Sequence, residues 1–180
     1  MRALSLTFMV LAFLVGGFCA GILFKNIDNR MGSDGDPKKT DEVYQLVENA
    51  KKQVETFKKQ GIDVTKVDDP QIQEYLELIE SVPPRWQVDY AGNTGIVLAA
   101  LALVMVVVAF IKKALVTPLS ILVALLSIVL WYITPYMEEG TFSGANPKTI
   151  ALIACIGLMV CAACAFMSYK LHLKKSQVTV

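Results

Sequence analysis

The sequence contains little of the chemistry that catalytic and metal sites require. Among its 180 residues there are one histidine and four cysteines, and no cysteine lies in residues 25–92. Zinc sites are built mostly from cysteine and histidine, so we expect neither a metal nor another cofactor. Paired carboxylates, a histidine cluster and a nucleophile beside a base are not recognisable. We therefore expect the protein not to be an enzyme.

Charge is absent from four long apolar stretches. They cover residues 3–24, 95–111, 114–132 and 149–168. A transmembrane helix needs about 20 mostly apolar residues, so each stretch predicts one membrane span. Ionisable residues inside a bilayer commonly mark ion paths or proton relays. Their absence argues against a self-contained proton pump and against a carrier of charged substrates.

The first stretch has a second interpretation, because an apolar run after Arg2 is also typical of a signal peptide. The run is long for the apolar part of a signal peptide, and no A-x-A-like site follows it. We interpret residues 1–24 as an uncleaved signal anchor.

Charges outside the spans are distributed unequally. Residues 25–92 carry 10 basic and 14 acidic residues. This excess of acids among the lysines argues against nucleic acid as a partner. The other side of the membrane receives basic residues alone, which are Arg2, Lys112, Lys113, Lys170, Lys174 and Lys175. The positive-inside rule places these cations and both termini in the cytoplasm, with residues 25–92 outside, in a plasma or inner membrane.

The extracytoplasmic segment begins with a predicted linker, residues 25–40, in which glycine and proline interrupt any apolar periodicity. Helical periodicity follows from Thr40 or Asp41, either of which is a plausible N-cap, to Gln60. Gly61 is placed to end that helix.

A second amphipathic helix begins at Asp69 and Pro70, an N-cap followed by proline at the first helical position. It ends before Pro83, so the segment predicts a helical hairpin. A lone hairpin buries little surface, and its apolar stripe should lie on the span ends, on a second copy or on another subunit. The stripe residues that we predict to make contacts are Leu46, Val54, Phe57 and Leu76.

Small residues form stripes in the first and fourth spans. Gly17 and Gly21 have GxxxG spacing, and Gly157 and Cys161 share one face of the fourth span. Such stripes allow helix backbones to approach closely in lipid, so we expect these two spans to pack closely on each other or on partners. Cys161 and Cys164 form a C-x-x-C pattern, but thiols buried in an apolar helix are inert, and packing is the favoured interpretation.

Aromatic residues gather before the second span and after the third. Trp86 and Tyr90 lie in the segment 83–93, which we interpret as a rigid elbow leading into the second span; a surface for a lipid headgroup or a partner is the alternative. Interfacial tryptophan and tyrosine prefer the headgroup level, which agrees with the predicted span boundaries.

These patterns predict an all-α membrane protein with four transmembrane helices and a two-helix extracytoplasmic hairpin between spans one and two. Its parts are a signal anchor (1–24), the linker and hairpin (25–92), and a three-span region with a short cytoplasmic tail (93–180). We expect a non-catalytic structural or accessory subunit of a larger membrane complex, with other subunits, its own copies and membrane lipids as partners. The alternative is a protein that binds or transports a lipid or apolar ligand.

Overall fold

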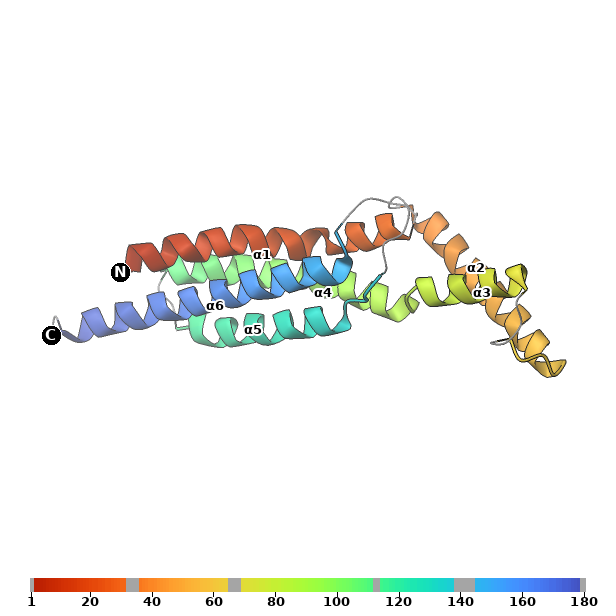
Figure 1. The fold of residues 1–180 in the computed structure, drawn as a ribbon. Helices are drawn as coiled ribbons and strands as arrows, with labels where there is room; N and C mark the ends of the chain where they lie inside the picture. The colour runs from red at the N-terminus through yellow and green to blue at the C-terminus, as the bar shows by residue number, and fades with distance from the viewer. Residues whose placement is uncertain (1, 32–35, 65–68, 112–113, 138–144, 179–180) are drawn as a thin grey trace.

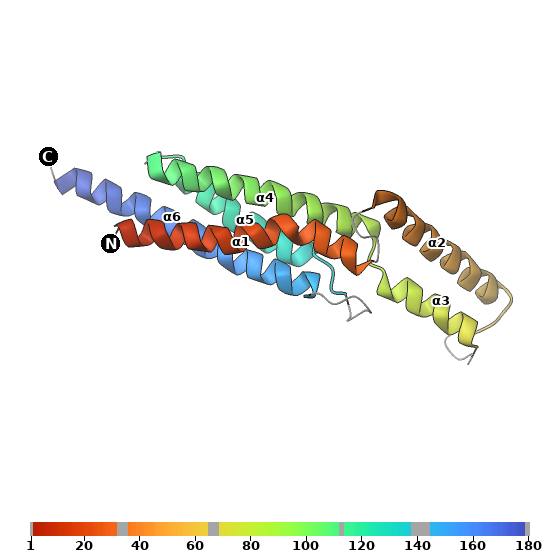
Figure 2. The ribbon, with the colours of Figure 1, turned by 90° about the horizontal axis from the view of Figure 1, so that it is seen from above.

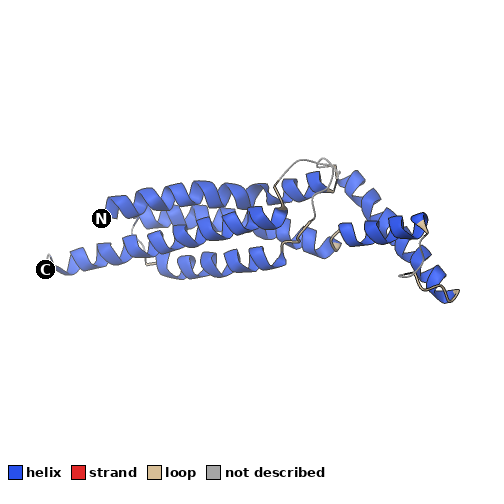
Figure 3. Ribbon diagram, viewed as in Figure 1, coloured by secondary structure: helices blue, strands red, loops and turns tan. Residues whose placement is uncertain are grey.

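The chain folds into six α-helices in the computed structural model, which describes residues 2–31, 36–64, 69–111, 114–137 and 145–178. Within these ranges all regular structure is helical (Figure 3). The helices are α1 (Arg2–Arg30), α2 (Pro37–Lys59), α3 (Pro70–Ser81), α4 (Arg85–Ile111), α5 (Val116–Ile133) and α6 (Pro147–Val178). Four of them, α1, α4, α5 and α6, contain the apolar windows long enough to cross a membrane, which confirms the four predicted helices.

The four long helices lie lengthwise beside one another as a bundle (Figures 1 and 2). Helix α1 packs against α6 and α4, and α5 packs against the same two helices, with a further contact between α4 and α6. Both termini lie at one end of the bundle, while α2 and α3 extend beyond the opposite end (Figure 1). We call α2 and α3 together the arm, and the end that carries them the arm end.

The bundle has apolar side chains both in its core and on its outer surface, as expected for helices surrounded by lipid. Met9, Leu98 and Leu158 are fully buried in the common core. Other large apolar side chains point outward, including Phe18, which is 66% exposed. The apolar windows of the four helices are only 28% to 44% buried inside the protein. Water would make such a surface costly, whereas hydrocarbon solvates it.

The predicted linker was too long at both ends. Helix α1 continues to Arg30, and α2 begins at Pro37 with Asp36 as its N-cap. The Asp36 carboxylate accepts a hydrogen bond of 2.9 Å from the backbone N–H of Lys38. The prediction of Thr40 or Asp41 as N-cap was therefore wrong: Asp36 and Pro37 form the same Asp–Pro signal that begins α3.

The other predicted boundaries agree more closely with the structure. Gly61 has φ of +81°, a left-handed conformation that suits glycine after a helix. Asp69 caps α3 by accepting from the N–H of Gln71 at 2.8 Å. Lys112 and Lys113, two of the cations used to assign the sides of the membrane, lie outside the described residues.

The arm has a small apolar core of its own, separate from that of the bundle. Val54, Val64 and Ile72 are buried there. Partly buried side chains pack around them, namely Phe57, Tyr75, Leu76 and Ile79. The apolar faces of α2 and α3 thus cover each other at the end of the arm far from the bundle.

Candidate functional site

A short break between α3 and α4 connects the arm to the bundle. Only Val82, Pro83 and Pro84 separate the two helices. Val82 is extended, with φ of −97° and ψ of 116°, as expected for a residue before proline. Pro84 already belongs to the first turn of α4, since its carbonyl accepts from the N–H of Gln87 at 2.9 Å. Of the predicted elbow, residues 83–93, only Pro83 and Pro84 lie outside a helix, and the rest is the start of α4.

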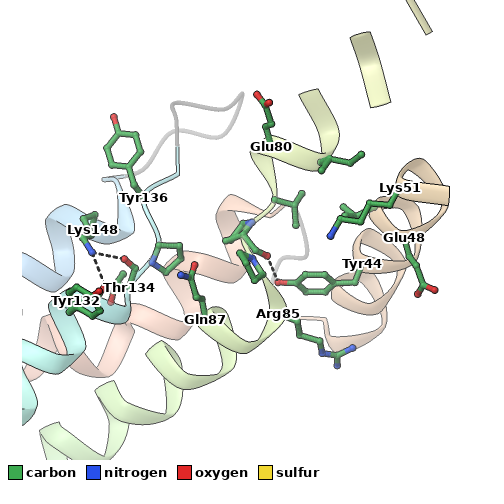
Figure 4. A pocket seen from close by; sticks show the side chains of 16 residues that line it. Tyr44, Glu48, Lys51, Glu80, Arg85, Gln87, Tyr132, Thr134, Tyr136 and Lys148 are labelled. Carbon is green, nitrogen blue, oxygen red and sulfur yellow. Dashed lines mark hydrogen bonds between the residues drawn. The ribbon is translucent and has the colours of Figure 1, made fainter. Parts of the chain in front are cut away.

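Tyr44 joins three parts of the chain at this break. Its hydroxyl donates to the Pro83 carbonyl at 3.1 Å and lies 3.7 Å from the Met31 sulfur at the end of α1. The Arg85 guanidinium lies over its ring, 5.6 Å from the ring centroid. One side chain of α2 therefore contacts the end of α1, as well as the α3–α4 break and the start of α4, which Figure 4 shows beside it.

Charges around Tyr44 reinforce this connection and change its acidity. Arg85 forms an ion pair of 2.8 Å with Asp41 and a longer one of 3.8 Å with Asp89. The pKa of Tyr44 is raised to about 12, chiefly by burial and also by the nearby Asp89 and Asp28 carboxylates, while Arg85 opposes the rise. Tyr44 therefore remains a neutral hydrogen-bond donor at any physiological pH. The ion pairs are more than half exposed, so each contributes no more than about 1 kcal/mol.

Asp28 is a feature that sequence reasoning missed, since it was assigned to a solvated linker. It lies near the end of α1 and is only 4% exposed. The extension of α1 past the apolar stretch is what buries it. Its charge acts on Tyr44, as the pKa of that phenol shows.

Lys148, in the first turn of α6, caps the C-terminal end of α5. Its ammonium donates to the carbonyls of Trp131, Tyr132 and Thr134 at 2.6, 3.1 and 2.9 Å. It also lies 5.1 Å from the centre of the Trp131 ring. The last carbonyls of a helix have no partners within it and carry partial negative charge. A cation on a neighbouring helix satisfies them here, a role that sequence spacing does not reveal.

An open cleft of about 780 Å³ lies between the arm and the arm end of the bundle (Figure 4). Side chains of α2 and α3 form one wall, with Lys51 and Glu80 among them. The end of α5 and the start of α6 form the other, with Tyr132, Tyr136 and Lys148. The α3–α4 break lies between the two walls.

A second hollow is smaller and almost wholly apolar. It measures about 410 Å³ and lies between the first half of α1 and the last part of α4. The residues lining it are Ala3, Leu6, Thr7, Val10, Leu11 and Phe110. This groove is at the end of the bundle that carries both termini (Figure 1).

Of the predicted small residues, Gly157 lies at the contact between α1 and α6, whereas Gly17 and Gly21 do not line that contact. Helices α1 and α6 pack closely, and Gly157 lies against the backbone of Gly16. Gly21 has an open side, with nothing within 4 Å of a Cβ atom added there, and a Cβ atom added to Gly17 would meet only Phe13 of the same helix. The glycine of α1 that meets α6 is Gly16, one residue earlier, whereas the carbonyl of Ala20 lies against Gly95 of α4.

The other predicted contact residues fall into two groups. Val54, Phe57 and Leu76 pack inside the arm, and Cys161 is fully buried in the bundle. Three side chains instead face outward: Leu46, Trp86 and Tyr90, at 57%, 55% and 63% exposure. Trp86 and Tyr90 also pack edge to face, with ring centroids 6.4 Å apart.

Thiols and acids in the described part of the chain form no site. The four cysteines are free thiols, and Cys161 and Cys164 are not bonded to each other. No group of three or more histidine, cysteine or acidic side chains within the described residues could hold a metal ion.

Four long apolar helices, packed together with large apolar side chains outward, define a membrane-embedded helical protein with four candidate spans. Comparison of the chain with protein families, with curated proteins and with solved structures finds no match. Its function is therefore argued from the geometry of the arm and of the two hollows.

Proposed function

We propose that the protein is a non-catalytic accessory subunit of a larger integral membrane complex, in which the arm docks another subunit on the extracytoplasmic side. One observation carries this proposal. The arm projects beyond the bundle while Tyr44 and Arg85 fasten its base. A projecting element held at its base presents its surface in one orientation, which lowers the ordering cost of binding.

The charges at the ends of the helices support one orientation of the bundle across the membrane. Lys170 and Lys174 lie in the last turns of α6, at the bundle end that carries both termini. Cytoplasmic ends of membrane helices are enriched in lysine and arginine. With that end in the cytoplasm, the arm and its acidic residues lie outside the membrane on the other face.

The surface of α2 offers the contact. The Leu46 side chain is 57% exposed on α2, whereas Val47 and Ala50 nearby are buried, with only 5% and 2% of their surface exposed. Glu42 and Asn49, about one helical turn before and after Leu46, are exposed polar residues on the same face. Apolar anchors surrounded by polar residues are typical of binding hot spots.

The test is purification of the full chain from its native membrane in a mild detergent, with Leu46→Ala as the variant and Lys52→Ala as the control. We expect other polypeptides to co-elute in fixed stoichiometry with the wild type and with Lys52→Ala. Leu46→Ala should lose them while keeping its thermal stability. A monomer without co-eluting protein, at low detergent, would contradict the proposal.

The second candidate function is binding or transport of a lipid or apolar ligand. The apolar groove between α1 and α4 favours it, since Leu6, Val10 and Phe110 present hydrocarbon to any chain lying there. Thr7→Trp would fill the groove. If this function holds, the variant loses a lipid that the wild type retains through purification, while co-eluting proteins are unaffected.

A further inference from the structure

The cleft beside the arm lies next to exposed aromatic residues at the end of α5. Tyr132 and Tyr136 line it and are 79% and 71% exposed, and Trp131 lies next to them in α5. Tryptophan and tyrosine gather at the headgroup level of membranes. With the four helices in a bilayer, the cleft therefore opens among the lipid headgroups.

Most charges of the cleft are already satisfied within the protein. Lys148 has three N–H donors, and all three go to the α5 carbonyls. Arg85 pairs with two aspartates, and Glu48 pairs with Lys52. Lys148 thus has no N–H donor left for a ligand, and Arg85 and Glu48 each already have a charge of opposite sign beside them.

Two charges of the cleft, Lys51 and Glu80, have no ion-pair partner among the described residues. Lys51 extends from α2 toward the α3–α4 break, and Glu80 lies at the rim on α3 (Figure 4). The cleft thus offers one cation and one anion from its two arm helices. Its other wall adds the exposed phenol rings of Tyr132 and Tyr136.

We propose that this cleft binds the zwitterionic headgroup of a phospholipid, with the phosphate at Lys51 and the ammonium group at Glu80. The proposal rests on the bundle spanning a membrane with the arm at its surface, and it is independent of protein docking. Phosphate and ammonium each meet one charge of opposite sign that forms no ion pair with another described residue. The tyrosine rings add a favourable surface for a cation.

The volume and lining of the cleft agree with such a ligand. Small-molecule sites commonly measure about 300–1,000 Å³, and this cleft measures about 780 Å³. An anionic headgroup would leave the Glu80 carboxylate beside a second negative charge, which costs free energy. A headgroup that carries both signs avoids this repulsion.

The experiment is native mass spectrometry of the full chain in detergent, with phosphatidylethanolamine, phosphatidylcholine or phosphatidylglycerol added at equal mole fraction. The variants are Lys51→Ala and Glu80→Gln. Lys59→Ala and Glu77→Gln are matched controls, since they change the same residue types on the same helices away from the cleft. We expect about tenfold less zwitterionic lipid on each cleft variant, and wild-type retention on both controls.

A charge exchange separates recognition from folding. The double variant Lys51→Glu with Glu80→Lys keeps both charges in the cleft. It should therefore retain more zwitterionic lipid than Lys51→Glu alone or Glu80→Lys alone. Equal retention by the wild type and the cleft variants would overturn the proposal. So would a preference for phosphatidylglycerol that Glu80→Gln strengthens, because the cleft would then be an anion site.

Discussion

Gly16 of α1 and Gly157 of α6 meet backbone to backbone, with no side chain between them. A Cβ atom added to Gly157 would lie 2.8 Å from the Cα of Gly16, and one added to Gly16 would lie 2.7 Å from the backbone nitrogen of Leu158. Close approach of this kind maximises packing in lipid, where the hydrophobic effect does not hold helices together. It explains how α1 can lie along α6 while most of α1 faces outward.

Gly16→Ala should therefore destabilise the bundle, because the neighbouring atoms are backbone and cannot move aside. Overpacking of this kind typically costs about 1–3 kcal/mol. Gly21→Ala is the matched control, since nothing lies within 4 Å of its added methyl group. Thermal unfolding in detergent should show a lower midpoint for Gly16→Ala alone. Equal midpoints for the two variants would refute the assigned contact.

Val54→Ala should loosen the arm without affecting the bundle. Val54 is 6% exposed in a core whose other buried residues, in the part of the arm that the structure describes, are Val64 and Ile72. Removal of its buried methyl groups costs about 2 kcal/mol. Hydrogen exchange should accelerate in α2 and α3 and remain unchanged in α1 and α6. Leu46→Ala, an exposed position on the same helix, should leave exchange at its wild-type rate. If both variants behave alike, the small core does not stabilise the arm.

Tyr44→Phe should free the base of the arm. The variant keeps the ring under Arg85 but loses the hydrogen bond to the Pro83 carbonyl, a loss of about 1 kcal/mol. Spin labels on the tip of α2 and on α5 should then report a broader distance distribution in pulsed electron resonance. Tyr75→Phe, also in the arm, serves as the control. An unchanged distribution in Tyr44→Phe would show that other contacts fix the arm.

The ionisation of Tyr44 gives a test by pH. Its pKa is raised to about 12 by burial and nearby acids, so the folded state holds this proton more tightly than the unfolded chain does. The sign follows: its stabilising contribution is present below pH 10 and is lost as the pH rises through 12. Subtracting the ultraviolet titration of Tyr44→Phe from that of the wild type should leave a step near pH 12. A step near pH 10 would contradict the burial of this phenol.

Lys148→Met should weaken the end of α5. The change leaves three carbonyls without their charged donor. A hydrogen bond to a charged group typically makes a net contribution of about 1.5–3 kcal/mol, and water replaces part of this at an exposed helix end. Hydrogen exchange should accelerate in the last turn of α5. Lys170→Met, on the same helix at its other end, should leave that turn unchanged. Protection of the α5 end in both variants would argue against this cap.

Local sequence signals predicted the helices well. The Asp69–Pro70 signal and Gly61 bounded helices correctly because caps act within one turn of the chain. The same Asp–Pro signal at Asp36 and Pro37 begins α2, one turn before the apolar periodicity that predicted its start at Thr40 or Asp41. Apolar length alone identified the spans, since a bilayer requires it of any crossing helix.

Contacts between distant residues depended on the fold. GxxxG spacing suggested Gly17 and Gly21, yet the face that meets α6 begins at Gly16, because helix rotation is set by all neighbours together. No sequence pattern predicted the roles of Tyr44 and Lys148, since each donates to carbonyl groups far along the chain. The cleft combines side chains from five helices.

The sequence by itself determined four membrane-length helices and two amphipathic ones, because hydropathy and capping are local properties. The tertiary structure alone decided which helices are neighbours, how the base of the arm is fastened by Tyr44, and where Lys51 and Glu80 open onto a common cleft. Those depend on packing and on hydrogen bonds between residues far apart in the chain, for which no short-range pattern exists.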